Sequence, residues 1–144
     1  MENNAAMKDG SGNRVRPADG RRRMEIRIKR IYEPPGPDDG TRILVDRLWP
    51  RGISREAAKI DYWARAVSPS DSLRKWYGHD PDQWPEFRKR YAGELDGQVE
   101  EVALLAEKLK AGPVTFLYGS VERKWNNALA LKLYLERWMK KRNM

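Results

Sequence analysis

The chain has 144 residues, of which 40% are hydrophobic and 35% are charged, which suits a single domain with one core. It contains no cysteine, and this excludes disulfides, cysteine-ligated zinc and thiol chemistry. The formal net charge of +8 lies mostly at the ends: residues 1–23 hold six basic and three acidic residues, residues 132–144 hold five and one, and residues 24–131 are nearly neutral.

No apolar run reaches the roughly 20 residues of a membrane helix, and the N-terminus lacks the apolar stretch of a signal peptide. A cytoplasmic protein without membrane contact is the default expectation. Residues 1–23 are rich in Asn, Gly, Asp and Arg, so we expect a disordered basic tail there. The compositional change at Met24 predicts one domain over residues 24–141.

Two strands are predicted early in the domain. Residues 25–32 alternate isoleucine with charge, and residues 42–47 hold the apolar run Ile43-Leu-Val45 that is typical of a strand buried on both faces. The proline- and glycine-rich stretch 33–40 between them predicts a loop. Ser54 is a candidate N-cap for a short helix through Ala58, and residues 60–67 are a weaker candidate for a third strand.

The second half predicts four helices and one strand. Ser68-Pro69 can begin a helix that Gly78 ends, and Asp80 or Asp82 can cap the next one. Apolar residues at spacings of three and four predict helices around residues 84–95, 99–109 and 128–138, and residues 113–118 predict a strand. The order favours an α/β domain with a small parallel or mixed sheet covered by helices. In such sheets, ligands bind beyond the carboxyl ends of the strands.

The segment Asp46-Arg-Leu-Trp-Pro-Arg-Gly52 follows the most apolar strand, so it is the first candidate site. The guanidiniums of Arg47 and Arg51 match phosphate or carboxylate, Trp49 can stack on a ring, and Asp46 can orient an arginine or act as a base. The alternative is structural: an Asp–Arg pair that ties the strand end, with the indole in the core.

A second candidate lies after the last strand. Tyr118, Asn126 and Asn127 are predicted ligand-binding residues near a helix start, and Ser120 is a candidate nucleophile without a base nearby in the sequence. The alternative is that one Asn caps the helix and the other is exposed.

His79, the single histidine, precedes Asp80 and is a third candidate for acid–base work, or else a surface residue. No metal-ligand spacing and no glycine-rich phosphate loop is present, so neither a metal nor another cofactor is predicted.

Four segments together resemble the YeaO-like branch of domain-of-unknown-function family 488: Met24–Tyr32, Arg42–Gly52, Leu73–Asp80 and Asn126–Ala128. The resemblance covers about residues 24–138 and implies a small α/β domain, bacterial or archaeal and cytoplasmic. It implies no established activity. The family pattern after the last strand resembles Tyr-Ala-Ala-Lys-Asp-x-x-His-Asn-x-Ala, from which Val121, Glu122 and Trp125 depart.

The function expected from these features is binding of a small phosphate- or carboxylate-bearing anion, such as a nucleotide, at the strand ends. Whether catalysis follows is open. One alternative is a nucleic-acid-associated accessory protein that uses its basic ends, and another is a non-catalytic protein-interaction module.

Overall fold

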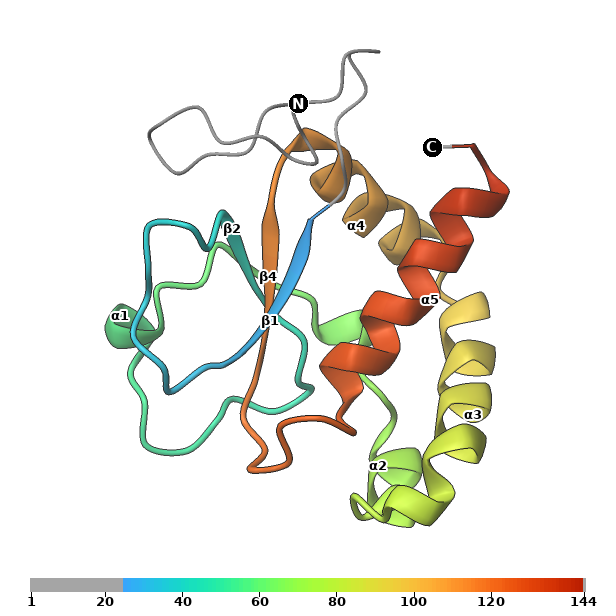
Figure 1. Ribbon diagram of the computed structural model, residues 1–144. Coiled ribbons are helices and arrows are strands. Elements are labelled where there is room, and N and C mark those ends of the chain that lie inside the picture. The colour runs from blue at the N-terminus through green and yellow to red at the C-terminus, as the bar shows by residue number, and fades with distance from the viewer. Residues whose placement is uncertain (1–24, 144) are drawn as a thin grey trace, which may run out of the picture.

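The computed structural model describes residues 25–143. Four strands form one parallel sheet in the order β1-β4-β2-β3: β1 Ile26–Arg30, β2 Thr41–Leu44, β3 Tyr62–Trp63 and β4 Val114–Tyr118. The last strand in the sequence, β4, therefore lies between the first two (Figure 1). The predicted α/β class, with a small sheet covered by helices, is confirmed.

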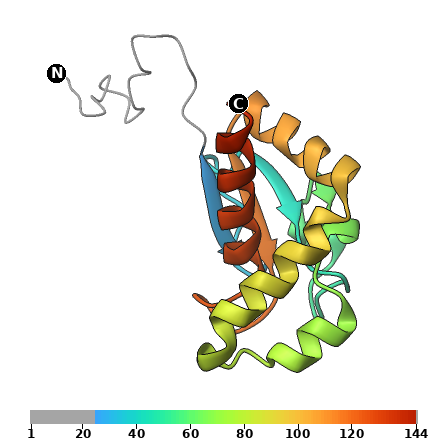
Figure 2. The same ribbon diagram turned by 90° about the vertical axis from the view of Figure 1, so that its right-hand side faces the viewer.

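Helices cover the two faces of the sheet unequally. One face carries α2 Asp71–Tyr77, α3 Trp84–Asp96, α4 Val99–Ala111 and α5 Asn127–Lys141, whereas among the described residues only the short helix α1 Arg55–Ala58 lies on the other (Figure 1). Figure 2 shows α5 running alongside the strands, with α3 and α4 packed beside it. No helix within residues 25–143 is long and apolar enough to cross a membrane.

The main core lies between the sheet and the four helices. Strand side chains alternate between faces, so Val114, Phe116 and Tyr118 point into this core, whereas Leu117 points to the opposite face. Ile43 and Val45 enter the main core in the same way. The continuous apolar runs of β2 and β4 are therefore explained by burial on both faces, as in other parallel sheets.

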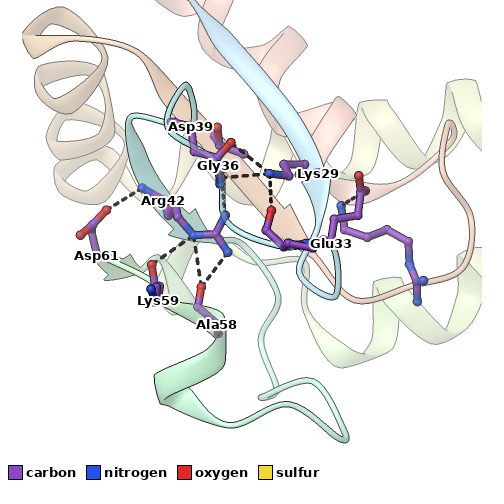
Figure 3. Close-up of polar contacts among 11 residues, drawn as sticks. Lys29, Glu33, Gly36, Asp39, Arg42, Ala58, Lys59 and Asp61 are labelled. Atoms are coloured by element: carbon purple, nitrogen blue, oxygen red, sulfur yellow. Dashed lines mark hydrogen bonds and ion pairs between the residues drawn. The ribbon is translucent and has the colours of Figure 1, made fainter.

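The opposite face has a smaller core and a buried ionic network. Ile31, Leu44, Ala58 and Leu117 form the apolar part. Beside it, the guanidinium of Arg42 donates to Asp39 at 2.6 Å and to the carbonyls of Ala58 and Lys59 at the end of α1 (Figure 3).

Lys29 completes this network by donating to both carboxylate oxygens of Asp39 and to the carbonyl of Pro34. Burial by itself raises the pKa of Asp39, but hydrogen bonds from Gly36, Lys29 and Arg42 outweigh burial and hold that pKa below its ordinary value. The charged groups satisfy one another, so the network stabilises the face that has no long helix to cover it.

Several element boundaries differ from the sequence prediction. The third strand is only Tyr62–Trp63, because the chain then turns through a 3₁₀ segment, Arg65–Val67. Ser68 does not begin a helix: its buried hydroxyl donates to the carbonyl of Val45, and Ser70 caps α2.

Ser54 and Asp80 both act as helix caps, whereas one residue predicted to be buried is exposed. Ser54 caps α1 as predicted, with its hydroxyl accepting from Ala57. Asp80 caps the 3₁₀ turn Pro81–Gln83, and that turn leads directly into α3. Val99, expected on the buried face of α4, is 66% exposed. The predicted tail over residues 1–23 lies outside the described residues.

Candidate functional site

Asp46 lies beyond the end of β2, as expected, but it is engaged in holding the fold. Its carboxylate accepts the N–H of Gly119 at 2.8 Å and the amide of Asn127 at 3.1 Å. Burial raises the pKa of Asp46, which these two hydrogen bonds and the charges of Arg74 and His79 only partly offset. Gly119 fits this close approach, because a Cβ there would lie 3.2 Å from the carboxylate.

Arg47 and Trp49 point in different directions from Asp46. The guanidinium of Arg47 donates to the carbonyls of Ser68 at 2.9 Å and Pro69 at 3.0 Å. Trp49 packs on the smaller core, edge-on to Trp63, and its indole N–H donates to the carbonyl of Ile53. Both side chains thus contribute to the structure of the loops around the strand ends.

Tyr118 and Trp49 lie on opposite faces of the sheet, and Arg51 is at the surface. Tyr118 is buried in the main core, where burial raises its pKa, whereas Trp49 packs on the opposite face of the sheet. Arg51 is exposed, and its carbonyl accepts from the hydroxyl of Tyr32. Its guanidinium has no ion pair or hydrogen bond among residues 25–143. Trp49 and Tyr118 therefore do not face the same site.

Asn126 and Asn127 each have a structural role. The fully buried Asn126 caps α5 by accepting from the N–H of Leu129, and it donates to the carbonyl of Glu122. Asn127 donates to Asp46 and to the carbonyl of Val45. One alternative predicted that one Asn caps the helix and the other is exposed. Asn126 is the cap, but Asn127 is half-buried.

The loop between β4 and α5 is held by its own hydrogen bonds. The carboxylate of Glu122 accepts the N–H groups of Lys124 and Trp125, which lowers its pKa. Trp125 packs against Trp84 with ring centroids 5.2 Å apart. The Ser120 hydroxyl reaches only the carbonyl of Glu122, at 3.3 Å, so the described residues offer it no base. Two of the three departures from the family pattern therefore have structural roles: Glu122 accepts hydrogen bonds within the loop, and Trp125 packs on Trp84.

His79 lies at the surface just after α2. Its backbone has a positive φ of 59°, and its ring lies edge-on to Tyr77 at 5.6 Å. Tyr77 is engaged as well, since its hydroxyl donates to the carbonyl of Trp125. Within residues 25–143, no three His, Asp or Glu side chains are grouped as a metal site requires.

A cavity lies elsewhere, on the helical face. It is a groove of about 690 Å³ between α3, α5 and the start of α4, which we call the α3–α5 groove. Buried apolar side chains line its floor, and five cations border it, namely Arg88, Lys89, Arg137, Lys141 and Arg142. The single carboxylate in the lining, Asp96, accepts from the hydroxyl of Tyr134 at 2.7 Å.

Three of these cations, Arg88, Arg137 and Lys141, make no ion pair, hydrogen bond or other charge interaction within the part of the chain that the structure describes, whereas Lys89 has an electrostatic attraction to Glu86 without an ion pair. Three cations elsewhere on the helices pair with acids about one turn away, in Arg74–Asp71, Arg90–Glu86 and Lys110–Glu107. The groove was not predicted from the sequence, because its residues come together only when α3 packs against α5.

Comparison with known proteins gives consistent matches. Residues 25–144 match the family model DUF488-N3i, described as the inactive DUF488-N3 subclade. The chain is 40% identical over 112 residues to the uncharacterised protein YeaO of Escherichia coli, covering 78% of this chain and 97% of that protein. It is 41% identical over 96 residues to an uncharacterised protein of Mycobacterium tuberculosis, covering 65% and 81% of the two chains. No solved structure matches significantly.

Proposed function

Because the chain belongs to the DUF488-N3i family, the inactive DUF488-N3 subclade, we propose that it is a non-catalytic binding protein whose partner is anionic and occupies the α3–α5 groove. The observation that supports this most is the presence of three unpaired cations along one groove. The strand-end residues support it indirectly. Asp46, Arg47 and Asn127 are all engaged in tying the fold together, so little there is left to perform chemistry.

Charge around the groove favours an anionic partner. Five cations and one carboxylate line it, and that carboxylate is already hydrogen-bonded by Tyr134. Neighbouring like charges repel over about 10 Å at ordinary ionic strength, and they attract and orient an incoming anion over the same range. An anionic partner would therefore relieve a repulsion that the free protein leaves unbalanced.

Fluorescence anisotropy of labelled polyglutamate, with labelled polylysine as its opposite, tests this proposal. We expect the wild type to bind polyglutamate and not polylysine, with affinity falling as salt rises. The double variant R137E/K141E should bind at least tenfold more weakly. Lys140→Glu is the matched control, because Lys140 is an exposed cation on the same helix outside the groove. Equal losses in both variants would contradict the proposal.

A second candidate keeps the small anionic ligand, phosphate, nucleotide or carboxylate, at the strand ends. The observation that favours it is the exposed Arg51 guanidinium, which has no partner among residues 25–143. A thermal-shift screen of these three anion classes tests it, since a ligand that binds the native state raises the apparent Tm. We expect a shift that Arg51→Ala abolishes without changing the Tm of the free protein. If no anion stabilises the wild type, this candidate is removed.

A further inference from the structure

The floor of the α3–α5 groove is apolar, which narrows the class of partner. Leu95, Val102 and Ala130 are buried beneath it, and the apolar surface that solvent still reaches belongs to the half-buried Ala92, Tyr134 and Trp138 and to the exposed Val99. A partner with charged side chains alone would make no apolar contacts with this floor. Apolar side chains inserted there would remove surface from water at roughly 25 cal/mol per Å².

The start of α4 extends the apolar surface at one end of the groove. Val99 is 66% exposed although it begins an amphipathic helix, and it is among the residues that line the groove. The unpaired cations come from both sides, Arg88 from α3 and Arg137 and Lys141 from α5. An apolar floor between two basic walls complements a segment with an apolar stripe flanked by acids. A helix that presents anchors at spacings of three, four and seven residues has that pattern.

A nucleic acid fits this groove less well. Single-stranded nucleic acids bind by stacking bases on open aromatic faces beside basic side chains. Here the guanidinium of Arg142 already lies 3.8 Å from the centre of the Trp138 ring. Trp84 is only 8% exposed and packs on Trp125, and the hydroxyl of Tyr134 is held by Asp96. The groove therefore offers apolar side chains and charge rather than open platforms.

The chain's own N-terminal segment does not have the complementary charge. Residues 1–23 hold six basic and three acidic residues, so like charges would oppose their docking between the basic walls. This segment is therefore not the expected occupant of the groove.

We propose that the partner is an acidic amphipathic helix of another protein, bound with its apolar stripe on the groove floor and its carboxylates against Arg88, Arg137 and Lys141. This inference rests on the proposed function and specifies its partner. It requires both the charge of these cations and accessible apolar surface in the groove, and the two requirements can be tested separately.

The experiment measures anisotropy of a labelled model helix of about 14 residues, with leucines along one face and glutamates along the flanks. A peptide of identical composition in scrambled order and a labelled oligothymidylate are compared with it. Ala92→Trp fills the groove without changing charge, because Ala92 is a half-buried lining residue on α3. Ala111→Trp, at the exposed end of α4 outside the groove, is the matched control.

We expect the helix to bind at least tenfold more tightly than its scrambled form. R137E/K141E and Ala92→Trp should each weaken binding at least tenfold, whereas Lys140→Glu and Ala111→Trp should not. Circular dichroism confirms that each variant is folded. If Ala92→Trp binds like the wild type, or the scrambled peptide binds equally well, the helical partner is wrong while an anionic partner still stands. If oligothymidylate binds more tightly than the helix, and R137E/K141E weakens that binding, the helical partner is likewise wrong while an anionic partner still stands. If neither the helix, polyglutamate nor oligothymidylate binds, both proposals fail.

Discussion

The side-chain amide of Asn127 donates to the carboxylate of Asp46 at 3.1 Å and to the carbonyl of Val45 at 2.9 Å. These bonds tie the start of α5 to the end of β2, 81 residues away in the sequence. Gly119 donates to the other carboxylate oxygen of Asp46, so one acid fixes the segments after both central strands.

Asp46→Asn should destabilise the protein by about 1–3 kcal/mol, because each carboxylate oxygen accepts one of these two bonds and the substitution turns one oxygen into an NH2 donor that faces another donor. Urea denaturation measures the change. Adding Asn127→Asp should recover part of the loss, since the amide introduced at position 46 can then donate to the carboxylate introduced at position 127. If D46N is as stable as the wild type, the carboxylate does not hold these segments.

The buried Asp39 predicts an acid-sensitive contribution to stability. Removing one partner of a buried ion pair costs about 3–5 kcal/mol, so Asp39→Asn should be strongly destabilised at neutral pH. The pKa of Asp39 in the folded protein is lowered from 3.8, so its stabilisation is complete above that value and is lost as the pH falls through the folded pKa. The difference in unfolding free energy between wild type and D39N should therefore shrink below about pH 4. A difference independent of pH would contradict this assignment.

Gly40 is the glycine whose replacement should be most damaging. Its φ is +64°, and a Cβ built there would overlap the carbonyl oxygen of Pro113. Gly52 also has a positive φ, +78°, but a Cβ there meets nothing within 4 Å. We expect Gly52→Ala to cost about 1 kcal/mol from backbone conformation alone and Gly40→Ala to cost more than twice that. Thermal unfolding of the two variants side by side decides the matter, and equal Tm values would refute it.

Arg47 and Arg51 should respond differently to substitution. Arg47 donates two hydrogen bonds to the Ser68 and Pro69 carbonyls, and lysine cannot reproduce that forked geometry. Arg47→Lys should lose about 1–2 kcal/mol of unfolding free energy. Arg51→Lys is the matched control and should stay within about 0.5 kcal/mol, because Arg51 is exposed. Chemical denaturation of both variants tests the pair, and a stable Arg47→Lys protein would show that these bonds are dispensable.

The sequence predicted the strands and helices well because their signals are local. Ile43, Leu44 and Val45 predicted a strand buried on both faces, and all three are fully buried. The site was harder to predict, because the direction in which a side chain points depends on partners that are distant in the sequence. Arg47 and Trp49 are two residues apart, yet one is directed by carbonyls after β3 and the other by the smaller core.

The buried network shows the same limit. Asp39 was included in a loop and Arg42 in a strand, and nothing within those few residues indicates that α1 would present its last carbonyls to the guanidinium. One signal was available: Arg42 directly precedes three fully buried residues, and an arginine at such a position needs buried acceptors. The groove had no local signal, because its walls come from helices more than thirty residues apart in the sequence.

The position of β4 in the sheet also has a consequence for biosynthesis. The strands β1 and β2 do not pair with each other, and each finds its long neighbour only in residues 114–118. At roughly 5–20 residues per second, a ribosome needs several seconds to add the intervening segment after β2 has been made. During that time the edges of β1 and β2 that later pair with β4 remain unpaired. The chain is therefore expected to complete its sheet late in translation, with the nascent first half dependent on shielding from other chains.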